Sequence, residues 1–245
     1  MDLRSILKND VLRIKASCDY EMLFLCEDGF ARDTNHNETR LRVEFIHNYY
    51  EDEDSIITTE KTIASMVIRV YKYKEYHDIY DISEERFDSI ICVNTAMDYI
   101  SICKKYPDLN TTFNYIDKER NITICDIYDI FIDSEYRGIG LSEYMLCMIP
   151  TILREYLGVT IGVISIDMYK FTFQKNEDGD MFHVYDEKKE KIRKIMAKSL
   201  FKTGFIEVDE DYGHYAIDLS TLEKKASALK VDTGFTGRYC SLDDE

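Results

Sequence analysis

Hydrophobic residues follow two different spacings along the chain, and these predict strands and helices in turn. Segments 11–16 and 41–47 alternate apolar with polar residues, as half-buried β-strands do. Other stretches are short runs rich in β-branched and aromatic residues, which also favour strands. Together, the expected strands are 11–16, 41–47, 62–73, 121–133, 159–166, 205–208 and 214–219.

Two longer segments, 83–100 and 187–202, carry apolar residues at helical spacing. Gly204 ends the second of them, as a glycine just past a helix does. A further short helix is expected after Asp19, whose side chain suits an N-cap. Strands that alternate with helices predict an α/β or α+β protein, in which helices pack on a mixed sheet.

Length and composition favour a single large domain. The 245 residues are 45% hydrophobic and include only 2 prolines, which allows one substantial core and no long flexible linker. The predicted domain covers residues 1–219, with a helical insertion at about 74–120 and a polar, acidic tail at 220–245. The 7 cysteines form no C-x-x-C pair and the 5 histidines show no metal-ligand spacing, so we expect free thiols, no metal site and a reducing cytoplasm.

The formal charge of −16 limits the expected partners. Such a surface repels nucleic-acid backbones and anionic lipid, and no apolar run approaches the length of a membrane span. We therefore expect neither nucleic acid nor a membrane as partner, and a cationic one instead, such as a small amine or a basic protein segment. The oligomeric state stays open, although short terminal strands of this kind could pair two chains into a homodimer.

The stretch 121–150 is where chemistry is expected. A β-prone segment ends at Asp133, a tight turn follows at Tyr136-Arg137-Gly138-Ile139-Gly140, and apolar residues then recur at helical spacing. The N-terminus of a helix presents backbone N–H groups without intrahelical partners, and glycines let an anion approach them closely. The pattern predicts a phosphate-binding turn, or alternatively a strand–helix turn in which the glycines serve tight packing alone.

This stretch resembles the signature of the GNAT N-acetyltransferases, and the resemblance covers about 121–219. The family signature is an apolar strand, an Arg/Gln-x-x-Gly-x-Gly/Ala turn and a helix, followed later by a helix that ends in Gly-Phe before a strand hairpin. Here Arg137 to Ser142 and Gly204-Phe205 match it, with Ser142 in place of glycine or alanine. The resemblance implies a mixed, mostly antiparallel central sheet flanked by helices, acetyl-CoA as cofactor, and acetyl transfer to a primary amine.

The resemblance also implies which residues would hold acetyl-CoA. Backbone N–H groups of the turn would bind the diphosphate, and the preceding strand would pair with the pantetheine arm like an added strand. The backbone N–H of Ile132 is a candidate donor to the thioester oxyanion. The expected cofactor-binding residues are Phe131, Ile132, Arg137, Gly138, Ile139, Gly140, Leu141 and Ser142.

The catalytic groups are less clearly marked. Many family members place a tyrosine, as acid, four residues before the glycine of Gly-Phe, where this chain has Leu200. Asp126 is the candidate base, because an acidic residue at that spacing deprotonates the amine in the histone-modifying branch of the family. Asp129 is a weaker candidate, since strand parity places it on the opposite face. The candidate substitute acids are Tyr169, Tyr212 and Tyr215.

Alternatives to these assignments stay open. Asp126 could instead face solvent or pair with a basic residue, and each tyrosine could be structural. With Leu200 in the acid position, the chain could also be a weakly active or inactive GNAT-like module that binds an acyl-CoA or a protein partner.

Overall fold

A computed structural model describes most of the chain. The described residues are 12–21, 37–50, 58–73, 87–105, 122–168, 173–175, 181–183, 186–209 and 213–228. They form a seven-stranded sheet in the order β1-β2-β3-β4-β5-β9-β8, and a separate hairpin of two short strands, β6 and β7.

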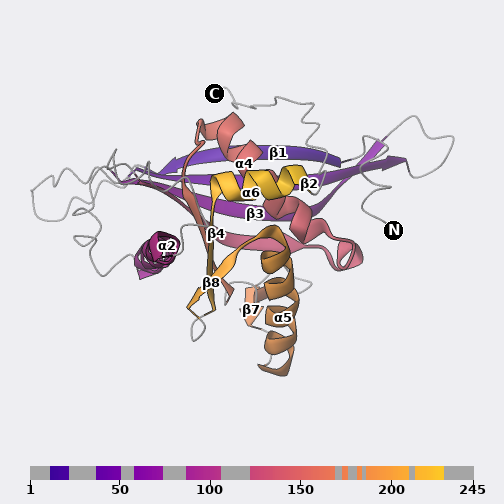
Figure 1. The fold of residues 1–245 in the computed structure, drawn as a ribbon. Helices are drawn as coiled ribbons and strands as arrows, with labels where there is room; N and C mark the ends of the chain where they lie inside the picture. Colours follow the sequence, from indigo (N-terminus) through magenta and orange to yellow (C-terminus); the bar gives the residue numbers. More distant parts are fainter. Residues whose placement is uncertain are drawn as a thin grey trace, which may run out of the picture.

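The large sheet is antiparallel except where β4 and β5 run parallel. The predicted α+β class, with a mixed and mostly antiparallel sheet flanked by helices, is therefore confirmed. Figure 1 shows β1, β2 and β3 running across the molecule, while β8 points away from their direction. The strands are β1 Leu12–Glu21, β2 Asn37–Tyr50, β3 Thr58–Tyr73, β4 Ile122–Ile132, β5 Val163–Asp167, β6 Phe173–Lys175, β7 Met181–His183, β8 Ile206–Asp209 and β9 His214–Asp218.

Helices cover both faces of the sheet. On one face, α4 (Leu141–Leu157), α5 (Asp186–Thr203) and α6 (Leu219–Ala228) share a core with alternate side chains of the strands. On the other face, α2 (Phe87–Lys105) packs over a smaller cluster that includes residues of β3, β4, β5 and β9. We call these the α4 face and the α2 face. Figure 1 shows α6 lying beside α4, with α2 apart from both.

Several element boundaries differ from the sequence-based expectation. Asp19 lies inside β1, so the predicted N-cap at this residue is wrong. The segment 167–186, in which no helix or strand was predicted, contains the β6–β7 hairpin. The helix expected at 83–100 is α2, which lies within the predicted insertion. The helix predicted at 187–202 is confirmed as α5 within one residue at each end.

The segment predicted as a tail after Leu219 begins with a helix that belongs to the core. In α6, Leu219 and Leu222 are buried among residues of the sheet and α4, and Ala226 is buried as well. The folded unit therefore continues to at least Ala228, beyond the predicted boundary. Among the described helices, none combines the length and apolar character that a membrane crossing requires.

One carboxylate on the α2 face joins three elements. The Asp218 side chain accepts hydrogen bonds from the Tyr99 hydroxyl of α2 at 3.1 Å, from Ser220 Oγ at 2.7 Å and from Thr221 N at 2.9 Å. The bond from Thr221 N makes Asp218, the final residue of β9, the N-cap of α6. Burial raises the pKa values of Tyr99 and of the Cys103 thiol beside it, which keeps both groups neutral.

Replacing Asp218 by alanine should therefore destabilise the protein by about 2–4 kcal/mol, because it removes a helix cap and leaves a buried hydroxyl without its acceptor. Urea unfolding, followed by circular dichroism, measures the change. Asp98→Ala is the matched control, since this aspartate is exposed on α2 and its loss should cost less than about 0.5 kcal/mol. Equal stability of the two variants would contradict the assignment.

Candidate functional site

The candidate site begins where the two parallel strands stop pairing. The ladder between β4 and β5 contains three residue pairs and ends at Asp126 and Ser165. Beyond this point β4 stays paired with β3 as far as Ile132, and β5 stays paired with β9 as far as Asp167. Because each strand keeps its outer partner and loses its inner one, the two halves of the sheet diverge here.

The turn after β4 has the geometry expected of an anion site. Gly138 and Gly140 adopt left-handed backbone angles, with φ of 79° and 91°. Gly140 is the N-cap residue of α4, and no side chain caps this helix end. The first helical hydrogen bond runs from Tyr144 N to Gly140 O, so the N–H groups of 141–143 precede the intrahelical ladder. The predicted strand, glycine turn and helix are thus confirmed, while phosphate binding stays a prediction.

Arg137 braces the turn. Its exposed side chain donates from Nε to the backbone carbonyl of Ile132 at 3.0 Å, which ties the start of the glycine sequence to the end of β4. Gly138 is exposed beside it, and an added Cβ there would meet no atom within 4 Å. The positive φ therefore explains the glycine, since space does not limit the residue at this position.

The residues that open α4 direct their side chains toward the protein. Leu141 is buried in the core. Ser142 Oγ lies 3.1 Å from Ser199 Oγ of α5, so this serine is held by the neighbouring helix. Glu143 accepts hydrogen bonds from Ser199 Oγ and from Lys202 Nζ, the latter at 3.0 Å. These residues can offer a ligand their backbone N–H groups.

Ion pairs organise the short helical turn η4 (Ser134–Tyr136) that precedes the glycines. Lys61 of β3 lies 3.3 Å from the Asp133 carboxylate and 2.5 Å from that of Glu135. The Glu135 backbone N–H donates to Asp133 Oδ1, and this bond, aided by Lys61, holds the pKa of Asp133 below its usual value. Hydrogen bonding to both carboxylates raises the pKa of Lys61, so Lys61 and Asp133 stay charged near neutral pH.

Asp126 is buried at the point of divergence, with 1% of its surface exposed. It lies opposite Arg69 of β3 and Ser165 of β5 in the two strand ladders. The alternative in which Asp126 faces solvent is therefore wrong. Ser165 is also buried, and its Oγ has no hydrogen-bond partner among the described residues. The Arg69 guanidinium lies 3.3 Å from the ring centre of Tyr128.

A β-bulge changes the face on which Asp129 lies. Asp126 pairs with Arg69 and Asp129 pairs with Val67, so three positions on β4 match two on β3. Because the bulge at Tyr128 adds one residue, Asp126 and Asp129 lie on the same α2 face. The parity argument that separated them is wrong, since it assumed a regular strand.

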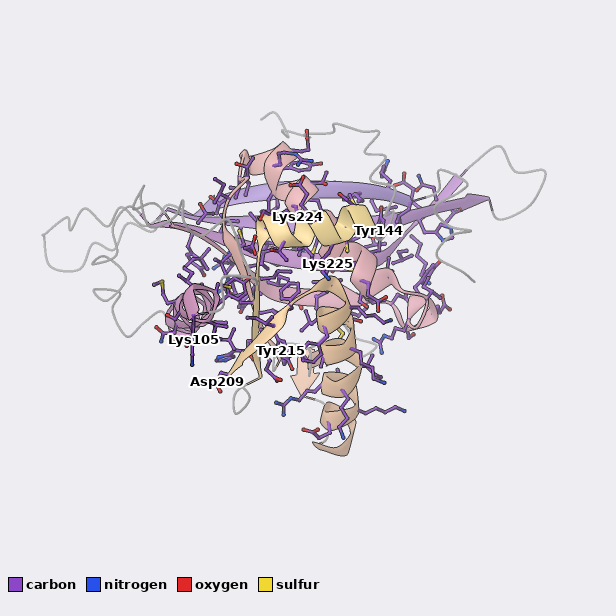
Figure 2. All side chains as sticks on the ribbon, viewed as in Figure 1. Lys105, Tyr144, Asp209, Tyr215, Lys224 and Lys225 are labelled. Atoms are coloured by element: carbon purple, nitrogen blue, oxygen red, sulfur yellow. The ribbon has the colours of Figure 1, made fainter. Side chains whose placement is uncertain are left out.

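The candidate acids are not all within the described residues. Tyr169 and Tyr212 lie outside them. Tyr215 is buried on the α4 face, where its hydroxyl donates to Glu207 Oε1 at 2.5 Å and its ring meets Phe201 of α5 edge-on. Figure 2 shows Tyr215 at the C-terminal hairpin, beside α5. Tyr215 and Asp126 therefore point to opposite faces of the sheet.

Leu200, at the position where the family often has its tyrosine, is fully buried in the core of the α4 face. Sequence reasoning missed Ser165, although a polar residue inside the apolar run of β5 was an available signal. It also missed Arg69, a charged residue inside the apolar run of β3, whose relation to Asp126 depends on the strand ladder.

No group of three or more histidine, cysteine, aspartate or glutamate side chains within the described residues is arranged to hold a metal ion. The candidate site consists of the edge of β4, the glycine turn and the N-terminus of α4, with the buried Asp126 carboxylate at the end farther from the turn.

Comparisons of the chain with known protein families, with curated proteins and with solved structures find no match.

Proposed function

We propose that this chain is a GNAT-like N-acetyltransferase that binds acetyl-CoA and transfers its acetyl group to a primary amine. The observation that carries the proposal is the early end of the β4–β5 ladder, which leaves the outer part of β4 without β5 as its partner. From there β4 leads through two left-handed glycines into α4, a helix without a side-chain cap. A ligand suited to this arrangement has an anionic group at one end and an extended, amide-bearing arm at the other.

Coenzyme A has both parts in the required order. Its diphosphate suits the backbone N–H groups at the start of α4, where the helix dipole also favours negative charge. Its pantetheine arm carries amides that can pair with the β5 side of β4, as an added strand would. With the diphosphate at Gly140, the arm runs back along β4 and brings the thioester near Asp126. The acidic surface, with its formal charge of −16, favours a cationic acceptor.

The residues at the inner end would then support the transfer. The amine must lose a proton to attack, and the Asp126 carboxylate is the proposed acceptor of that proton. The nitrogen–carbon bond forms as the carbon–sulfur bond breaks. Ile132, expected to donate its backbone N–H to the oxyanion, lies six residues from Asp126 along β4, which is about 20 Å in an extended strand and too far to serve the same thioester. The departing thiolate takes its proton from solvent or from Tyr169 or Tyr212, because Leu200 has none to give.

A second candidate function is a module that binds an acyl-CoA, or a protein partner, without catalysis. The observation that favours it is the burial of Leu200 in the core, together with the engagement of Tyr215 by Glu207. The enzyme and the acyl-CoA-binding module should both bind acetyl-CoA. Only the enzyme should release free CoA when an amine is present.

Gly140→Val should weaken acetyl-CoA binding by at least about tenfold, because a β-branched residue cannot keep the left-handed angle that presents the N–H groups of α4. Isothermal titration calorimetry measures the affinity. Gly158→Val is the matched control, since this glycine has a φ of 65°, ends the same helix and has open space around it. If both variants bind as the wild type does, the diphosphate is wrongly placed.

Asp126→Asn should lower the rate of CoA release with a reactive amine by about a hundredfold, while acetyl-CoA affinity changes less than about threefold. A thiol-detection assay over a panel of amines measures the rate. Asp129→Asn tests the neighbouring carboxylate on the same face and should have the smaller effect. A full rate in Asp126→Asn across the pH range would remove this residue as the base. Binding without CoA release from any amine would favour the second candidate.

A further inference from the structure

A buried histidine–tyrosine pair connects the glycine turn to the first half of the sheet. His47 of β2 and Tyr136 of η4 are both buried, and a hydrogen bond of 2.9 Å joins His47 Nδ1 to the Tyr136 hydroxyl. Their rings also meet edge-on, with centres 5.7 Å apart. Tyr136 directly precedes Arg137 and Gly138, so this contact ends where the turn begins.

Lys61 of β3 completes the connection. It lies directly opposite His47 in the β2–β3 ladder, and its ammonium group is 5.3 Å from the centre of the Tyr136 ring. The same ammonium group pairs with Asp133 and Glu135, the two acidic residues that precede Tyr136. Residues of two strands therefore hold the entry to the turn from one side.

We propose that His47 and Tyr136 are positioning residues for the cofactor, which set the shape of the glycine turn and make acetyl-CoA affinity depend on the protonation of His47. The inference rests on the proposed function, because it concerns the same turn. His47 lies outside the sequence motif that marks the turn, and Tyr136 is the residue that opens it.

The turn needs support from outside because its own residues supply little. Gly138 and Gly140 have no side chains, and nothing lies within 4 Å of a Cβ built at Gly138. Glycine also loses the most backbone freedom when it is ordered. The anchored ring of Tyr136 therefore restricts the backbone where the chain enters the turn, just before the glycines that lead to the N–H groups of 141–143.

The environment of His47 couples this support to pH. Burial, and secondly the charge of Lys61, lower the pKa of His47 below 6.5, so the imidazole is neutral at neutral pH. Among the described residues, Tyr136 shares a hydrogen bond with His47, and Lys61 lies opposite it in the β2–β3 ladder. Lys61 engages Asp133 and Glu135, and β1 places uncharged Leu12 opposite His47 on its other side.

Protonation adds a second positive charge beside Lys61 in a buried site, and the cation gains solvation when His47 moves toward water. Since the folded pKa is lowered, the neutral form and its contribution are present above pH 6.5 and are lost as pH falls through the folded pKa. Movement of His47 releases Tyr136, so acetyl-CoA affinity should fall in the same acid range.

Calorimetric titration of the full chain with acetyl-CoA, from about pH 5.5 to about pH 8, tests the inference. Tyr136→Phe keeps the ring and removes the hydroxyl, and should raise Kd about three- to tenfold at neutral pH. His47→Leu should do the same. His47→Asn, which can restore a hydrogen bond near the Nδ1 position without titrating, should bind nearly as the wild type does at neutral pH and lack its additional loss of affinity in acid.

Tyr99→Phe is the matched control, because it also removes a buried, hydrogen-bonded hydroxyl, on the α2 face and away from the turn. It should lower the unfolding midpoint without changing Kd. The comparison of variants at each pH cancels the titration of the ligand's own phosphates. If the wild type binds, an unchanged Kd in Tyr136→Phe together with a wild-type pH profile in His47→Asn would overturn the inference alone. No binding by the wild type at any pH would overturn the proposed function, and the inference with it.

Discussion

The short parallel contact between β4 and β5 is the constraint on which the rest of the structure depends. It joins two halves of the sheet, β1 to β4 and β5 with β9 and β8, through only three residue pairs. So short a ladder needs helices that span both halves. On one face, α2 packs over β4, β5, β8 and β9, and on the other α4 shares a core with strands from each half. These helices hold the two halves of the sheet together although only three residue pairs join β4 and β5. The two strands can therefore stay apart beyond Asp126 and Ser165.

The charges around the glycine turn are balanced, although the chain as a whole is strongly acidic. Among the residues that the structure describes, the acidic side chains of Asp133, Glu135 and Glu143 lie near it, together with the basic ones of Lys61, Arg137 and Lys202. Exposed ion pairs of this kind contribute little to stability. Their effect is local, because each acid that would repel an anion has a cation beside it. An acidic protein can therefore keep this turn free of uncompensated negative charge.

Features that depend on neighbouring residues in the sequence were predicted well, whereas features that depend on distant residues were not. The strand at 62–73 and the helix at 187–202 were predictable, since their residues repeat one pattern over many positions. The strand face of Asp129 was not, because one bulge at Tyr128 reverses every side chain beyond it. Helix α6 was missed as part of the core, since its short apolar pattern has meaning only against α4.

The sequence by itself determined the strand, the glycine turn and the helix at 121–150, because backbone angles and helix ends are set by neighbours along the chain. Only the tertiary structure decided that β4 and β5 separate after Asp126, that Asp126 and Tyr215 occupy opposite faces, and that His47 meets Tyr136. These relations join residues far apart in the chain. They depend on strand order and register, for which no local pattern is sufficient.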